Sequence, residues 1–166
     1  MSERNRGSRY RVSGRVHCWV LTFAVSVLTA CGSDDDAVDA TGGSELLQRV
    51  QDEDYRNWRR APGWESRLPS VASGHGGQLD IYVNDRVGAF LQNRGQVSAF
   101  PVGSTIVKDV WNGSELHAIA IMDKRDDGWY WAEFNGASDV SAAGHPVGCL
   151  NCHRGGVDYV RAFTLP

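Results

Sequence analysis

The segment Cys149-Leu150-Asn151-Cys152-His153 constrains this chain more than any other part of its sequence. In one helical turn, thiols at positions i and i+3 lie on the same face, so both can reach the two vinyl groups of a single porphyrin. The adjacent His153 can then bind the iron through an imidazole nitrogen. The segment therefore predicts one covalently attached haem c per chain, bound by Cys149, Cys152 and His153, with His153 as the iron ligand.

Two other uses of paired cysteines compete with this interpretation. A structural zinc site needs four ligands, and the two remaining cysteines, Cys18 and Cys31, belong to the N-terminal segment described next. Zinc would therefore need the C-x-x-C pair and two histidines, whose spacing does not suggest such a site. A thioredoxin-like dithiol is expected early in a chain, near a βαβ pattern. We expect haem, with zinc and dithiol chemistry as the alternatives.

The first thirty residues have the pattern of an export signal. Five arginines precede the apolar run 18–30, which is too short to span a bilayer as a helix. Leu28-Thr29-Ala30-Cys31 resembles a bacterial lipobox, in which the cysteine is diacylated and becomes the new N-terminus. We expect a signal peptide over 1–30 and lipidation of Cys31, which would anchor the protein in the bacterial cell envelope, facing the periplasm. The outer membrane is favoured, and an ordinary cleaved signal peptide is the alternative.

The charge balance narrows the class of partner. Without residues 1–30, the chain has 12 basic and 19 acidic residues, a formal charge of −7. This balance argues against nucleic acid as a partner, because no basic patch is available to neutralise phosphates. An acidic surface is compatible with a positively charged redox protein, although a solvated surface is its commoner meaning.

The rest of the sequence predicts a single α+β domain, mainly antiparallel β, over residues 44–166. Residues 31–43 are small and acidic, and we expect them to be a lipidated, disordered tether. An apolar face predicts an N-terminal helix over 44–60, and the glycines near His75 predict a loop over 62–77.

Alternation and β-branched residues predict the sheet that follows. The expected elements are a short helix over 87–92 and strands over 79–84, 105–111, 116–122 and 129–134. Asn112-Gly113 and Asp127-Gly128 are strong hairpin turns, so the last three strands should form an antiparallel meander. The C-x-x-C-H turn or helix would then follow this sheet as the haem-binding element.

The order of five segments resembles the cytochrome P-460 and cytochrome c′-beta family. Those proteins combine an antiparallel sheet with a C-terminal C-x-x-C-H haem, and they often dimerise through their sheets. The resemblance covers about Asp54 to His153. Its segments are Tyr55-Arg56-Asn57-Trp58, Leu79 to Asn84, Phe100 to Asp109, Trp129-Tyr130-Trp131 and the C-x-x-C-H motif.

The resemblance gives Lys108 a special role. In cytochromes P-460 the lysine of a V-K-[DE] segment is bonded to a haem meso carbon, which implies that Lys108 binds the haem and tunes its chemistry. The alternation places Lys108 on an otherwise apolar face, together with Ser104, Ile106 and Val110. Burial would favour its neutral, nucleophilic amine. From the residues alone, an edge or snorkelling lysine paired with Asp109 or Glu133 is the favoured interpretation, and the resemblance shifts the expectation to the haem.

The second axial side of the iron has several candidate residues. Hydroxylamine-oxidising family members carry a distal carboxylate on the strand after the lysine strand, where Glu115 and His117 are the candidates here. Each of them could simply end a strand. His75 or Met122 would be the extra ligand of a six-coordinate electron carrier. His145, four residues before Cys149, is expected near the proximal side.

An apolar distal wall would favour five-coordinate iron and small neutral ligands. We expect that wall to come from Val107, Ile119, Ile121 and the tryptophans. The first functional expectation is a lysine-modified haem protein that oxidises hydroxylamine or a related nitrogen species, or binds nitric oxide. The alternatives are a non-enzymatic gas-binding protein without the lysine bond and a plain electron carrier.

Overall fold

The computed structural model describes residues 37–70, 74–92 and 98–162, all within the compact unit Ser33–Pro166. The predicted signal peptide and the predicted lipidation site Cys31 lie outside the described residues. Within the described ranges, no helix is long and apolar enough to cross a membrane.

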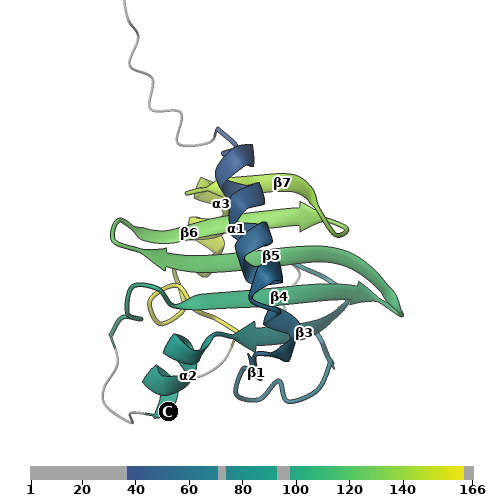
Figure 1. The fold of residues 1–166 in the computed structure, drawn as a ribbon, viewed down its shortest axis with the longest axis horizontal. Coiled ribbons are helices and arrows are strands. Elements are labelled where there is room, and N and C mark those ends of the chain that lie inside the picture. The colour runs from purple at the N-terminus through teal and green to yellow at the C-terminus, as the bar shows by residue number, and fades with distance from the viewer. Residues whose placement is uncertain (1–36, 71–73, 93–97, 163–166) are drawn as a thin grey trace, which may run out of the picture. The chain divides into compact units, whose positions relative to one another are not determined.

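Within the described residues, the body of the protein is an antiparallel sheet of seven strands (Figure 1). Its order is β1-β3-β4-β5-β6-β7, and the short β2 also pairs with β3. The strands are β1 (Arg59–Arg60), β2 (Leu68–Pro69), β3 (Gln78–Val83), β4 (Thr105–Asn112), β5 (Glu115–Arg125), β6 (Gly128–Asn135) and β7 (Asp139–Gly144). This architecture confirms the predicted α+β class with mainly antiparallel β structure.

In the part of the chain that the structure describes, three α-helices and one 3-10 turn accompany the sheet. In Figure 1, α1 crosses one face of the sheet and α3 lies behind the other. Their bounds are α1 (Ala40–Asp52), η1 (Tyr55–Asn57), α2 (Asp85–Gln92) and α3 (Val147–His153).

The N-terminal helix begins earlier than the predicted residue 44. Asp39 caps it, because its carboxylate accepts a hydrogen bond from the Gly42 N–H at 2.9 Å. Gly43 is buried and packs so closely against Ala143 of β7 that a larger side chain would collide there. Residues 40–43 therefore belong to the folded domain, and the predicted tether is wrong for that stretch.

The same helix ends at Asp52, well before the predicted residue 60. The chain turns at Asp54, which adopts a left-handed conformation with φ +52°. It then continues through η1 into β1, so Tyr55 and Trp58 are not on the helix.

Strands β3 to β6 lie where the alternation predicts them, within one to three residues at each end. Strand β7 was not predicted, because its sequence Asp-Val-Ser-Ala-Ala-Gly lacks the bulky alternating residues of a typical strand. It forms through pairing with β6 and contact with α1. Strand β2 is also new and lies within the predicted loop 62–77.

The central strands are buried on both faces because each face packs against a different core. The core beneath α1 includes Leu46, Val50, Tyr82, Val107, Ile119 and Phe134. The core on the opposite face includes Ile81, Ile106, Val110, Met122 and Trp131.

Three buried aspartates fix the N-terminal segment to the sheet. Asp109 is fully buried and accepts hydrogen bonds from the Tyr55 hydroxyl at 2.7 Å and from Arg56 Nε at 2.8 Å. Its cross-strand neighbour Asp80 is bound by two arginines, Arg60 and Arg67, at 2.6 and 2.8 Å.

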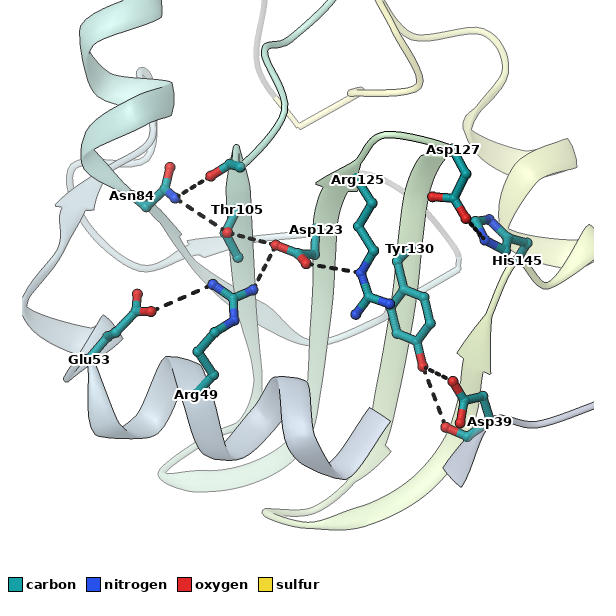
Figure 2. Close-up of polar contacts among 11 residues, drawn as sticks. Asp39, Arg49, Glu53, Asn84, Thr105, Asp123, Arg125, Asp127, Tyr130 and His145 are labelled. Carbon is teal, nitrogen blue, oxygen red and sulfur yellow. Dashed lines mark hydrogen bonds and ion pairs between the residues drawn. The ribbon is translucent and has the colours of Figure 1, made fainter. Parts of the chain in front are cut away.

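Asp123 is the third of these carboxylates and links α1 to the strands (Figure 2). It accepts hydrogen bonds from Arg49 of α1 at 2.7 Å and from the Thr105 hydroxyl at 2.9 Å. Arg125 approaches it at 3.3 Å and stacks over the ring of Tyr130. The helix is thus held by a continuous polar network in addition to its apolar face.

We predict that Asp109→Ala lowers the free energy of unfolding by about 2–3 kcal/mol, because the buried Tyr55 hydroxyl would lose its acceptor. The side chain of Arg56 is half-exposed, so water can solvate its guanidinium group in the variant. We therefore do not expect the larger loss of stability that follows when a fully buried charge loses its partner. Urea unfolding measures the change. Asp139→Ala, at an exposed end of β7, is the control and should change stability by less than about 0.5 kcal/mol. Equal stability of the two variants would contradict this role of Asp109.

Candidate functional site

A partly enclosed cavity of about 240 Å³ is formed by the sheet face opposite α1, by α3 and by the loop that carries His75. Both cysteines and the histidine of the C-x-x-C-H motif line it. Most of the other lining residues are apolar, among them Ile106, Ala120, Met122, Trp131, Ala142 and Val160. The structure therefore brings together His75, Lys108 and the three motif residues.

One row of side chains crosses the floor of the cavity from β4 to β7. Strand pairing places Lys108 opposite Ala120, Ala120 opposite Glu133, and Glu133 opposite Ala142. Adjacent strands are about 4.8 Å apart, so the backbones of Lys108 and Glu133 are separated by roughly 10 Å. The small alanines leave open space beside the amine and the carboxylate.

Lys108 faces the cavity because the side chains of β4 alternate between the two faces. Its neighbour Asp109 points to the opposite face, where Tyr55 and Arg56 bind it. An ion pair with Asp109, one of the open alternatives, is therefore wrong. Burial lowers the pKa of Lys108 to about 8, against the opposing charges of Glu133 and Cys152. A larger share of this amine than of an ordinary lysine is therefore neutral near physiological pH, although the charged form still dominates.

Glu133 is the carboxylate within the cavity. Burial raises its pKa, an effect that the positive charge of Lys108 partly opposes. In the sequence, Glu133 was considered only as an ion-pair partner for Lys108. Its position two residues after Trp131, on the same face of the strand, was the one feature that could have placed it in the cavity. The expected candidates, Glu115 and His117, are both exposed at the start of β5 and do not line the cavity.

The C-x-x-C-H motif forms helix α3, in which both thiols are free. Cys149 is partly buried and packs against the core on the cavity side, whereas Cys152 is exposed. Burial raises the pKa of Cys149, and the nearby Glu133 acts in the same direction. A redox-active dithiol requires a lowered thiol pKa, so this environment does not favour dithiol chemistry.

One ring nitrogen of His153, Nδ1, is hydrogen-bonded to the backbone, and the other, Nε2, does not take part in that hydrogen bond. Its Nδ1 lies 2.9 Å from the carbonyl oxygen of Tyr159. A carbonyl only accepts hydrogen bonds, so Nδ1 carries the proton and Nε2 keeps its lone pair. The ring packs edge-on against Trp131, with 4.6 Å between centroids. Burial lowers the pKa of His153, which favours the neutral form that a metal ligand requires.

His75 lies close to His153 across the cavity, with 6.2 Å between the ring centroids. Burial lowers the pKa of His75 to about 4, helped by the charges of Lys108 and His153. Its Nδ1 is buried and has no hydrogen-bond partner within the described residues. Met122, the other expected extra ligand, also lines the cavity.

Two predictions about the surroundings of the site are wrong. His145, which directly follows β7, lies against Tyr130 and approaches Asp127 at 3.5 Å (Figure 2), and it does not line the cavity. Of the predicted apolar wall, Trp131 lines the cavity, and Ile121 borders it although its side chain belongs to the core beneath α1. Val107 and Ile119 lie beneath α1, since they alternate with the cavity-facing residues.

Within the described ranges, no three His, Cys, Asp or Glu side chains come together to bind a bare metal ion. A structural zinc site would need four such ligands. No protein-family model and no curated protein matches this chain. Its function is therefore inferred from the chemistry of the cavity.

We predict a distinct pH dependence for the contribution of Lys108 to stability. The folded state carries the cost of a buried charged amine below pH 8, and this cost disappears as the pH rises through the window between about 8 and the ordinary 10.5. The wild-type residue should therefore gain stability relative to Lys108→Met as the pH rises through that window.

Urea unfolding at several pH values measures this difference. The protein with Lys108 and the Lys108→Met variant both carry Cys149→Ser and Cys152→Ser, so that no group is attached to the lysine amine. A difference that does not change between pH 7 and 10.5 would show that Lys108 is hydrated in the folded protein.

Proposed function

We propose that the cavity binds one haem c, with thioether bonds to Cys149 and Cys152 and with His153 Nε2 as the iron ligand. The observation that carries this proposal is that two free thiols and an imidazole with one available nitrogen line the same apolar cavity. Such a lining suits a porphyrin, which is largely apolar. The volume is just below the roughly 300–1,000 Å³ of typical small-molecule sites, so part of the porphyrin would remain in solvent.

We infer that the protein is an oxidoreductase for hydroxylamine or a related small nitrogen species, or a nitric oxide-handling protein. The haem, when bound, supplies an electron acceptor and a site for a small ligand. Glu133 supplies the base that proton removal from hydroxylamine requires. Its raised pKa makes its carboxylate a better proton acceptor, and it belongs to the same cavity as His153.

Lys108 has the second role in this proposal. Its resemblance to the lysine of the cytochrome P-460 family implies a bond between its amine and the porphyrin. A lowered pKa and a position on the cavity floor support this, because only a neutral amine is a nucleophile. The bond would tune the porphyrin by distorting it.

The location and partners of the protein are part of the same proposal. Export and a lipid anchor at Cys31 agree with haem attachment outside the cytoplasm, and their support is the sequence of residues 1–31. A negatively charged chain suits a positively charged redox protein as electron acceptor. Association into a homodimer through the sheet is implied by the family resemblance.

A second candidate function is electron transfer with His75 as an additional iron ligand. The observation that favours it is the pair of neutral imidazoles, His75 and His153, with 6.2 Å between their centroids. Such a protein would have no free position for hydroxylamine. Uptake of carbon monoxide by the reduced protein distinguishes the two, because only an open position takes up the gas readily.

We expect the purified protein to have the mass of the processed, lipidated chain from Cys31 plus one haem, and a far red-shifted ferrous Soret band that persists on unfolding. Lys108→Ala should restore an ordinary c-type spectrum while the haem stays attached. Intact mass and absorption spectra of both forms measure this. An ordinary spectrum in the wild type would remove the lysine bond from the proposal, and a mass without haem would overturn the proposal entirely.

We predict that Glu133→Gln lowers the rate of hydroxylamine oxidation by about 100-fold, the lower range for loss of a general base. Haem content and the Soret band should stay as in the wild type. Glu115→Gln is the matched control, since Glu115 is exposed and outside the cavity. Steady-state oxidation assays of the two variants measure the effect, and equal rates would exclude Glu133 as the base.

A further inference from the structure

The chain after α3 forms a tight turn that presents one carbonyl group to His153. Val160 N donates to the Val157 carbonyl at 2.9 Å, and the two residues form an isolated β-bridge. Asp158 and Tyr159, between them, have φ values of +44° and +66°. Two successive non-glycine residues in the left-handed region are costly, so other contacts must hold this turn.

The side chain of Asp158 provides those contacts. It accepts a hydrogen bond from the Phe100 N–H at 2.8 Å and from the Lys124 amine at 2.9 and 3.0 Å. The ion pair is well shielded, with side-chain exposures of 10% for Asp158 and 15% for Lys124. Lys124 belongs to β5 and lies over the ring of Trp129. The turn is therefore fixed to the sheet, not only to α3.

The contacts of Asp158, rather than burial of the Tyr159 ring, hold the Tyr159 carbonyl group in place. Its side chain is 38% exposed, whereas its carbonyl oxygen lies 2.9 Å from His153 Nδ1. We propose that Asp158 is a positioning residue for the proximal histidine, acting through the Tyr159 carbonyl. This inference rests on the proposed function, because it concerns His153 as an iron ligand.

The expected effect follows from the chemistry of the imidazole. A hydrogen bond from Nδ1 to a carbonyl fixes the tautomer and the ring orientation, and it makes Nε2 a stronger electron donor. A stronger donor stabilises oxidised iron more than reduced iron. Loss of the Asp158 contacts would release the Tyr159 carbonyl, weaken the bond between His153 and iron, and raise the reduction potential.

The test compares the haem-loaded wild type with Asp158→Ala and Asp158→Asn. Asparagine can still accept from the Phe100 N–H but loses the ion pair with Lys124, so it should have the smaller effect. The measurements are the reduction potential and the iron–histidine stretching frequency of the reduced protein by resonance Raman spectroscopy. For Asp158→Ala we expect a tenfold shift toward reduced iron, which is about 59 mV for one electron, and a lower stretching frequency.

Arg49→Met is the matched control. It breaks an ion pair of similar geometry with Asp123, whose side chain is 12% exposed, on the α1 side of the sheet. Any general loss of stability should appear in this variant too, but its potential and stretching frequency should equal those of the wild type.

Each outcome decides the inference. Wild-type potential and frequency in both loaded Asp158 variants would overturn the positioning role and leave the proposed function intact. The same shift in Arg49→Met would also overturn it, by showing a general effect of destabilisation. Should Asp158→Ala fail to bind haem, Asp158→Asn gives the same comparison. A wild-type protein without haem would overturn the proposed function and this role together.

Discussion

The buried carboxylate of Asp109 determines which way the side chains of β4 point. Tyr55 and Arg56 bind it beneath the N-terminal segment, so its neighbour Lys108 must face the opposite side of the sheet. A register slip of one residue would exchange the two faces and place a lysine amine in the core beneath α1. Two side chains that do not line the cavity, Tyr55 and Arg56, thus fix the Lys108 amine within it. The arrangement also connects Tyr55-Arg56 and Lys108-Asp109, two separate parts of the family resemblance, in one physical unit.

The cavity exists because the second face of the sheet is incompletely filled. Beneath α1, large side chains such as Phe134 and Ile119 close the core. On the opposite face, Ala120 and Ala142 lie in the same row as the two ionisable residues and leave space above them. Low polarity around this space shifts the pKa of both ionisable groups toward their neutral forms. The small side chains of Ala120 and Ala142 therefore leave room for a ligand. The low polarity of that room also shifts the pKa values of the two ionisable groups that such a ligand would contact.

Features encoded locally could be predicted from the sequence, whereas features set by pairing between strands could not. The hairpin at Asn112-Gly113 and the C-x-x-C-H helix are local, and the structure has both elements at the predicted places. The start of α1 was missed because the capping residue Asp39 is one of many small and acidic residues. Glu133 was not predicted to line the cavity, because its position opposite Ala120 depends on the register of β5 and β6, which no short segment reveals. His145 was misplaced because it follows β7, a strand that is stabilised by its neighbours rather than by its own sequence.

Helix α3 buries none of its own residues. The two cores of the sheet are largely built from other elements, so the sheet does not depend on α3 for most of its apolar contacts. Cys152 is exposed, and Cys149 is only partly buried. The sheet and its two cores can therefore form without α3 fixed in its final place. For the proposed haem, covalent attachment would then follow the folding of the sheet rather than start it.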